Sequence, residues 1–124
     1  MRRLTGGRLT VAGLIVPALT LHSTGARSGL PRSTELMCVP DGDGWLVTGS
    51  NFAGQKHPAW TYNLIRHPEA AVTYRGRRIA VTARLVGDDE REATWAFIER
   101  QWPGYRGYER VSGRQLRIFR LRRI

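Results

Sequence analysis

Cysteine and lysine are almost missing from this chain of 124 residues, which contains one of each. A single cysteine, Cys38, excludes an internal disulfide, so the chain fits a reducing compartment. Cys38 lies in an apolar run, and we expect it to be a small buried hydrophobe and not a nucleophile. The three histidines lack the spacing of metal ligands, so no zinc site is expected.

Long apolar runs are missing as well. The apolar stretch over residues 9–19 is shorter than the roughly 20 residues that a membrane-spanning helix needs, and Pro17 interrupts it. It faintly imitates a signal peptide, but Arg8 intrudes and no clear cleavage pattern follows. We therefore expect residues 1–17 to form an N-terminal strand or packing arm of a cytoplasmic protein, with at most peripheral contact with a membrane.

Acidic residues are half as frequent as basic ones, ten against twenty, and the formal net charge is +10. This excess favours an anionic partner such as nucleic acid, an anionic lipid or a phosphorylated cofactor. The arginines are spread along the chain, and many alternate with apolar residues, as solvent-facing strand positions do. Charge alone therefore does not choose among these partners.

Short strand-like runs joined by tight turns dominate the pattern, and 41% hydrophobic content indicates a globular domain over residues 18–124. Asp41–Gly44 predicts a hairpin turn, because glycine supplies the positive φ that such turns require. A second hairpin turns about Gly76. The predicted strands are residues 18–23, 32–39, 45–50, 70–75, 78–86 and 116–121.

Two helices interrupt the strands. The first is predicted to begin at Pro58, whose missing N–H is harmless there, and to end before Pro68. The second carries Trp95 on its apolar face and is predicted to open with a capping box between Asp89 and Glu92. The order β-β-β-α-β-β-α-β predicts an α+β fold, mainly β: an antiparallel barrel with two or three helices packed outside.

The turn between the first two strands, residues 24–34, reads Thr-Gly-Ala-Arg-Ser-Gly-Leu-Pro-Arg-Ser-Thr. Its glycines allow a close turn, Arg27 and Arg32 supply bidentate donors, and its hydroxyls supply short-range ones. Such a turn is able to cradle a phosphate. From composition alone, a solvated turn that merely contains arginines is the simpler interpretation.

Several motifs taken together resemble the deazaflavin-dependent nitroreductase family. The first is this turn, and the others follow in the family's order from about residue 18 to the C-terminus. They are Gly44-Trp-Leu-Val-Thr-Gly-Ser-Asn51, Lys56-His-Pro-Ala-Trp60, Asn63-Leu64, His67-Pro68 and Trp102-Pro-Gly-Tyr-Arg-Gly-Tyr108. The resemblance implies a split β-barrel, similar to FMN-binding barrels, that binds the 8-hydroxy-5-deazaflavin coenzyme F420.

The resemblance also implies which residues bind the coenzyme. Arg27, Ser28 and Arg32 match positions that hold its phosphate and acidic tail, although Ala26 stands where a second basic residue is common. The cofactor-binding residues implied are Ala26, Arg27, Ser28, Arg32, Ser33, Thr34, Leu36, Met37, Thr48, Gly49, Ser50, Asn51, Lys56, Ala59, Trp60, Thr61, Tyr62 and Asn63.

The reacting end is expected elsewhere. Ser50 and Tyr105 are the predicted proton or oxyanion donors. The predicted acceptor pocket consists of Met37, Phe52, Trp102, Tyr105 and Tyr108. The alternative for the three aromatic residues of the C-terminal motif is that they pack in the core.

These residues predict an oxidoreductase that transfers a hydride from reduced F420 to an enone, a quinone or a nitroaromatic compound. Three alternatives stay open: a non-catalytic F420 carrier, an FMN-binding split barrel and, least favoured because of the motif order, a basic nucleic-acid-binding barrel. The partner is then a small-molecule acceptor, without nucleic acid, and the protein is a monomer or a homodimer.

Overall fold

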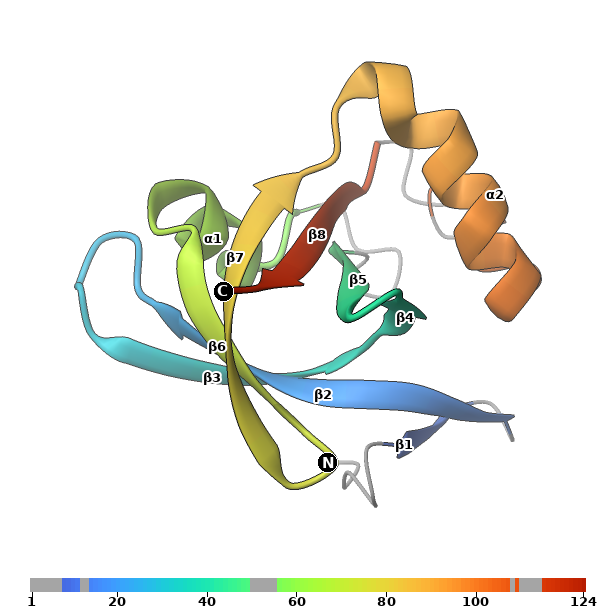
Figure 1. The fold of residues 1–124 in the computed structure, drawn as a ribbon. Coiled ribbons are helices and arrows are strands. Elements are labelled where there is room, and N and C mark those ends of the chain that lie inside the picture. Colours follow the sequence, from blue (N-terminus) through green and yellow to red (C-terminus); the bar gives the residue numbers. More distant parts are fainter. Residues whose placement is uncertain (1–7, 12–13, 50–55, 108, 110–114) are drawn as a thin grey trace.

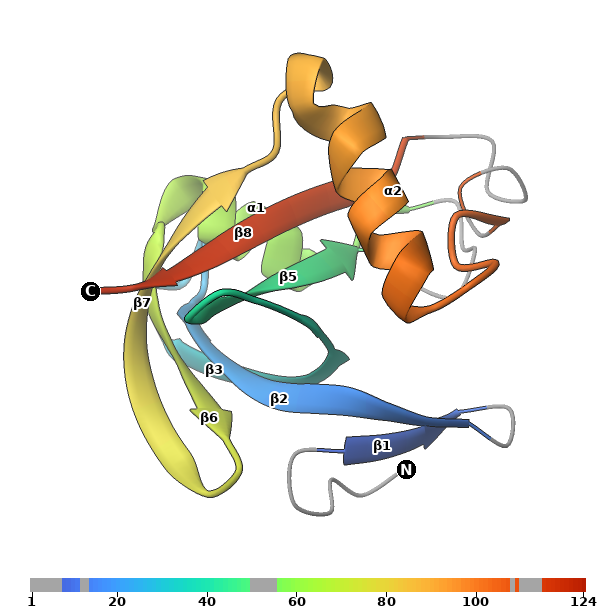
Figure 2. The same ribbon diagram turned by 45° about the vertical axis from the view of Figure 1, so that its right-hand side comes forward.

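A computed structural model describes residues 8–11, 14–49, 56–107, 109 and 115–124. Figures 1 and 2 show a strongly curved antiparallel sheet with a helix packed at each end. The helices are α1 (Ala59–Arg66) and α2 (Arg91–Gln101), and a 3-10 turn precedes α2 at Asp88–Glu90. The strands are β1 (Arg8–Val11), β2 (Leu14–Thr24), β3 (Pro31–Met37), β4 (Val39–Asp41), β5 (Gly44–Gly49), β6 (Glu69–Tyr74), β7 (Arg77–Leu85) and β8 (Arg117–Arg123).

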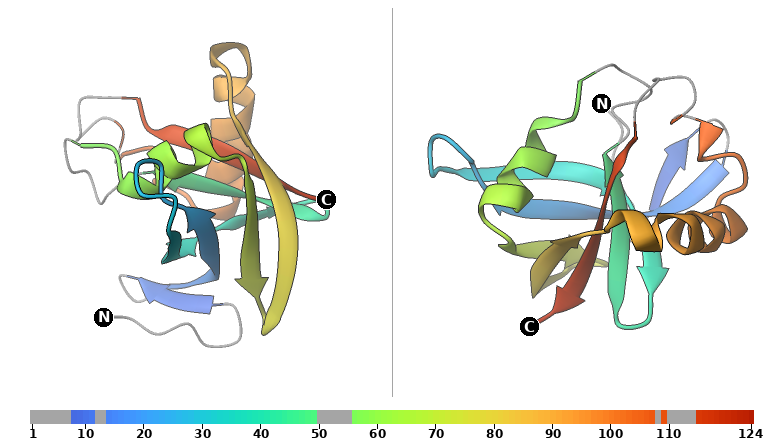
Figure 3. Two further views of the ribbon diagram at one scale, coloured as in Figure 1. Left: turned by 90° about the vertical axis from the view of Figure 1, so that its left-hand side faces the viewer. Right: turned by 90° about the horizontal axis from the view of Figure 1, so that it is seen from above.

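The long strand β2 organises the sheet. Its first half pairs with β1, its second half pairs with β3 on one edge and with β6 on the other, and Leu21 is opposite both Thr34 and Val72. The path then runs β6-β7-β8-β5-β4, so β8, the last strand in sequence, lies between β7 and β5. The sheet thus curls into the half-barrel visible from the side and from above in Figure 3.

Two apolar clusters hold this sheet. The first fills the half-barrel, and α1 closes it with Trp60, whose ring lies 5.7 Å from that of Phe119. The second lies between α2 and the opposite face of the β5–β8 region, where Trp95 and Ile98 meet Leu46 and Ile118. The two clusters are separate because successive strand residues point to opposite faces.

The predicted hairpins are confirmed. Gly42 and Gly76 adopt φ angles of 63° and 78°, in the left-handed region that favours glycine. Cys38 is 4% exposed, and burial raises the pKa of its thiol to about 12, so it is the inert hydrophobe expected. Its N–H donates to the Pro17 carbonyl, and this residue divides the predicted strand 32–39 into β3 and β4.

The predicted helix starts need correction. Pro58 is the N-cap of α1, with ψ of 149°, and the helix begins one residue later. The capping box between Asp89 and Glu92 is wrong, because α2 begins at Arg91 and its N-cap, Glu90, makes no side-chain cap. Glu92 instead pairs with an arginine beyond the helix, Arg106. Within the described residues, no helix has the length and apolar content needed to cross a bilayer.

His22 on β2 makes folding depend on pH. Its Nε2 lies 2.7 Å from Thr73 Oγ1 and its Nδ1 lies 3.0 Å from Ser33 Oγ. Burial, and then the charge of Arg78, hold the pKa of His22 below its ordinary value of 6.5. As the pH falls below 6.5, the unfolded chain takes up this proton before the folded chain does, so the free energy of unfolding decreases.

We therefore expect a His22→Gln variant to lose less stability than the parent protein between pH 7.5 and pH 5. Thermal unfolding followed by circular dichroism across this range measures the effect. His67→Gln, at the C-cap of α1, is the matched control and should keep the parental dependence. An unchanged pH dependence in His22→Gln would contradict the assignment.

Candidate functional site

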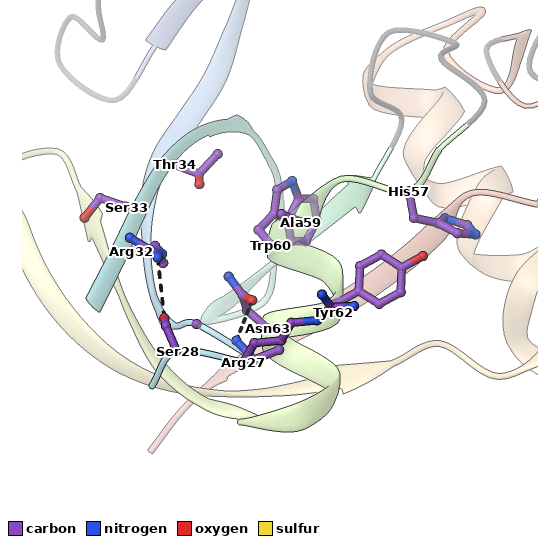
Figure 4. Close-up of a pocket in the computed structure, with 12 residues that line it drawn as sticks. Arg27, Ser28, Arg32, Ser33, Thr34, His57, Ala59, Trp60, Tyr62 and Asn63 are labelled. Atoms are coloured by element: carbon purple, nitrogen blue, oxygen red, sulfur yellow. Dashed lines mark hydrogen bonds between the residues drawn. The ribbon is translucent and has the colours of Figure 1, made fainter. Parts of the chain in front are cut away.

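A cleft of about 750 Å³ lies between the β2–β3 turn, β3 and α1. Figure 4 shows its lining side chains, which come from segments about 30 residues apart in the sequence. The lining residues are Gly25, Ala26, Arg27, Ser28, Arg32, Ser33, Thr34, His57, Ala59, Trp60, Tyr62 and Asn63.

The β2–β3 turn is closed by its own hydrogen bonds. The Gly25 N–H donates to the Leu30 carbonyl at 2.8 Å, and Ser28 Oγ accepts from the Leu30 N–H at 3.1 Å and from Arg32 Nη2 at 3.4 Å. A Cβ at Gly25 would lie 2.5 Å from Ser28 Oγ, so any other residue there would displace this hydroxyl from its place in the turn. The turn therefore has a defined shape that leaves the Arg27 side chain exposed at the cleft.

Asn63 joins the turn to the helix. Its Oδ1 accepts a hydrogen bond of 2.9 Å from the Ala26 N–H, across 37 residues of sequence. Asn63 is 8% exposed, and its neighbour Leu64 is 1% exposed in the core. The buried side of α1 thus fixes the distance between the two walls of the cleft.

The far end of the cleft is aromatic. Tyr62 lies edge-on to His57, with ring centroids 6.3 Å apart, and Figure 4 shows His57 beyond Tyr62 from Ser28 and Arg32. The guanidinium of Arg117, on β8, lies 4.4 Å from the centre of the Tyr62 ring and donates to Thr61 Oγ1 at 3.2 Å. Arg117 is therefore a positioning residue for this wall.

The two walls of the cleft differ in chemistry. The β2–β3 turn and β3 offer the guanidinium groups of Arg27 and Arg32 with the hydroxyl of Ser28, and no carboxylate lines the cleft among the described residues. This donor set fits a phosphate or carboxylate group, because guanidinium groups bind both in bidentate geometry. The wall formed by α1 and the residue before Pro58 offers the ring of Trp60, a phenol and an imidazole, which fit a planar ring with polar edges.

Ten of the eighteen predicted cofactor-binding residues line this cleft. Arg32 and Thr34 alternate on β3 and pair with inward-facing residues of β2, which brings their side chains to the cleft. The ten are Ala26, Arg27, Ser28, Arg32, Ser33, Thr34, Ala59, Trp60, Tyr62 and Asn63.

Six other predicted cofactor-binding residues lie outside the lining set. Thr61 is fully buried, and Gly49 has a structural role, because a Cβ there would lie 2.6 Å from Thr61 Cγ2. The remaining four are Leu36, Met37, Thr48 and Lys56. Ser50 and Asn51, with the predicted acceptor-pocket residues Phe52 and Tyr108, lie outside the described residues.

The structure does not bring Tyr105 to the cleft. It is 4% exposed in the apolar cluster under α2, stacked on Trp102 at 4.1 Å and edge-on to Trp95 at 6.0 Å. Trp102 is half-buried in the same cluster. The core alternative thus describes how both residues pack here, and the catalytic role of Tyr105 stays a prediction.

Sequence reasoning missed three residues around the cleft. Gly25 was identified only as a turn glycine, and His57 appeared only within the matched motif, with no role assigned to it. The sequence did not indicate a role for Arg117 at the site, because it is one of several arginines alternating with apolar residues in β8. Only the packing of β8 beside α1 distinguishes Arg117 from its neighbours.

Comparisons with known proteins agree with this geometry. A family model described as F420H(2)-dependent quinone reductase matches residues 1–122. The F420H(2)-dependent quinone reductase of Mycobacterium tuberculosis is 31% identical over 110 residues, which cover 86% of this chain and 74% of that protein.

Solved structures give the same result. An F420-H2-dependent reductase is 28% identical with a TM-score of 0.74, over 85% of this chain and 93% of that one. A chain solved as a domain-swapped dimer is 28% identical with a TM-score of 0.75, over 85% of this chain and 79% of that one. The heme storage protein HutZ from Vibrio cholerae, 17% identical with a TM-score of 0.62 over 86% of this chain and 81% of that one, shares the fold alone. The predicted split barrel is therefore confirmed.

Proposed function

Because the chain belongs to the F420H(2)-dependent quinone reductase family, we propose that the cleft between the β2–β3 turn and α1 holds the reduced coenzyme while a quinone is reduced. The protein is an oxidoreductase that depends on F420 and transfers a hydride to a quinone acceptor. The predicted cofactor and reaction are confirmed. Of the predicted acceptors, the enone and the nitroaromatic remain proposals. The family is named for quinone reduction, and the nitroreductase activity that the resemblance implied stays a prediction.

The observation that carries the proposal for the cleft is its donor set. Arg27, Ser28 and Arg32 come from the β2–β3 turn and the strand that follows it, and the turn's own hydrogen bonds define its shape. A coenzyme with a phosphate and an acidic tail needs such donors, and its planar ring needs the aromatic wall. We therefore assign the tail to the arginines and the ring to the side of the cleft formed by Trp60 and Tyr62.

The protein's own contribution is to hold and orient the two reactants. F420, when bound, supplies the hydride, and the cleft walls exclude water from its ring. Asn63 keeps the two walls at a constant distance through its bond to Ala26. A proton must also reach the acceptor oxygen, and we assign its donation to the imidazole of His57, which lies beyond Tyr62 from Ser28 and Arg32. Ser50 stays a second predicted donor.

An obstruction of the cleft tests this function directly. Ala59 is an exposed residue that lines the cleft at the first position of α1, so an Ala59→Trp side chain should occupy the space of the ring. We expect this variant to lose at least about tenfold in F420 affinity and in quinone reduction. Binding is measured by titration of the coenzyme's fluorescence, and turnover by its anaerobic reoxidation with a water-soluble quinone.

The matched control is Ile65→Trp, which adds the same side chain to the same helix outside the cleft lining. It should bind F420 and reduce the quinone as the parent protein does. Parental turnover in Ala59→Trp would contradict the location of the site, and binding of F420 without reduction of any quinone would support the carrier alternative. A nitroaromatic and an enone, assayed beside the quinone, define the range of acceptors.

A further inference from the structure

A second cavity, of about 410 Å³, lies where the end of β7, the start of β8 and the start of α2 come together. Figure 1 shows the end of β7 and the start of β8 side by side, near the start of α2. Sites for small molecules have volumes of roughly 300–1,000 Å³, so this cavity is large enough for a small ligand. Its lining residues are His57, Leu85, Val86, Asp88, Arg91, Gln115, Leu116 and Arg117.

His57 belongs to both cavities. It lines the cleft between the β2–β3 turn and α1, and it also lines the second cavity. Arg117 adjoins both as well, because it lines the second cavity while its guanidinium lies 4.4 Å from the centre of the Tyr62 ring, in the wall of the cleft. The second cavity therefore adjoins the wall of the cleft to which we assign the coenzyme ring.

The charges around the second cavity offset one another. Arg91 is 7% exposed, and its guanidinium is paired with the carboxylate of Glu109 at 2.5 Å. The salt bridges among the described residues do not include Arg117, but the carboxylate of Asp88, an exposed residue of the same lining, opposes its charge. A lining whose charges cancel attracts an anion only weakly. It favours an uncharged ligand, in contrast to the basic wall of the cleft.

The other lining groups indicate what this ligand is. Leu85, Val86 and Leu116 supply apolar surface. The Gln115 amide supplies N–H donors, and so does the guanidinium of Arg117, which uses one N–H for Thr61 Oγ1 and has others directed elsewhere. A planar apolar ring with carbonyl oxygens matches both kinds of surface, and a quinone is such a molecule.

We propose that the second cavity is the quinone site of the reaction proposed above, on which this inference rests. The quinone ring lies against Leu85, Val86 and Leu116, and one carbonyl oxygen faces the junction of the two cavities at His57 and Arg117. The site is separate from the acceptor pocket predicted from the sequence, since the lining includes none of the residues of that pocket.

This position explains how one proton donor serves the reaction. Once hydride has added to the quinone, the oxygen at the junction carries a negative charge, which the guanidinium of Arg117 stabilises. A ring N–H bond of His57 then breaks and an O–H bond forms, which completes the hydroquinone. Solvent returns a proton to the imidazole, and the oxidised coenzyme releases one proton to solvent, so no net proton is consumed.

Equilibrium dialysis with a small naphthoquinone tests the site without turnover. The full chain is saturated with oxidised F420, which fills the cleft but has no hydride to transfer, and the bound naphthoquinone is measured. Gln115 is exposed on the lining, so a Gln115→Trp side chain should obstruct the second cavity. We expect this variant to bind the naphthoquinone at least about tenfold more weakly, and its KM for this acceptor to rise by a similar factor.

Two further variants make the test specific. Gln101→Trp is the matched control, because it places the same side chain at an exposed glutamine outside both linings, and it should bind the naphthoquinone as the parent does. Leu85→Trp obstructs the second cavity from β7, where Leu85 is 44% exposed, and should reproduce the loss. F420 titration, with parental affinity expected for all three, shows that the variants are folded.

Parental affinity for the naphthoquinone in both test variants, or an equal loss in the control, would overturn the proposal. Displacement of the naphthoquinone by oxidised F420 would also overturn it, because the quinone would then occupy the cleft. Failure of the parent protein to bind F420 would instead contradict the proposed function, and dialysis without coenzyme would still decide whether the second cavity binds a quinone.

Discussion

Replacing both Arg27 and Arg32 by alanine is expected to weaken F420 binding by about 100-fold. A hydrogen bond between charged groups contributes roughly 1.5–3 kcal/mol, and the lower value applies because both side chains are exposed. About 1.4 kcal/mol corresponds to a tenfold change in dissociation constant, so two such losses multiply to this factor. Fluorescence titration of the coenzyme measures the effect.

The control for Arg27 and Arg32 removes the same charge elsewhere. Arg75→Ala with Arg77→Ala takes two exposed arginines from the β6–β7 hairpin, outside the cleft lining. Its affinity for F420 should stay within about threefold of the parent value, since distant exposed charges are screened by salt. Similar dissociation constants for the two double variants would show that the cleft arginines do not contact the acidic tail.

Removing the carboxylate of Glu109 is expected to destabilise the fold by about 3 kcal/mol, at the lower end of the cost of breaking a buried ion pair. Glu109 Oε2 lies 2.5 Å from Nη2 of Arg91, which is 7% exposed, and also accepts the Leu116 N–H at 2.9 Å. In a Glu109→Ala variant, the guanidinium of Arg91 stays buried without this partner. Urea denaturation measures the free energy of unfolding.

Two further variants separate this effect from general charge loss. Glu92 also pairs with an arginine, but its side chain is 80% exposed, so Glu92→Ala should leave the free energy of unfolding nearly unchanged. The double variant Arg91→Met, Glu109→Leu should recover much of the stability, because an apolar pair of similar volume replaces the ion pair. A Glu109→Ala variant as stable as Glu92→Ala would refute the assignment.

The hairpins and helices could be predicted from the sequence because their signals are local. Gly42 and Gly76 mark turns that need positive φ, and Pro58 and Pro68 mark the two ends of the first helix within one or two residues. The prediction of a capping box failed because it also used only local sequence. The pattern covers residues 89–92, whereas the partner of Glu92 is Arg106, fourteen residues away.

The site could be predicted in part. The β2–β3 turn and the motif from Lys56 to Asn63 identified ten residues of the cleft lining, since the family's motifs are specific in order and spacing. Tyr105 shows the limit of that reasoning. Its place in the motif favoured the site, but its ring packs between Trp95 and Trp102 under α2.

By itself, the sequence determined the turns, the periodicity of each strand, the anion-binding chemistry of the basic turn and the family with its coenzyme. The tertiary structure alone decided that β2 pairs on both edges, that β8 enters between β7 and β5, and that Asn63 and Arg117 hold the walls of the cleft. These contacts join residues 37 and 56 positions apart. Their formation depends on the combined burial of whole strand and helix faces, which offsets the entropy of closing long loops, and no local stretch of residues encodes that balance.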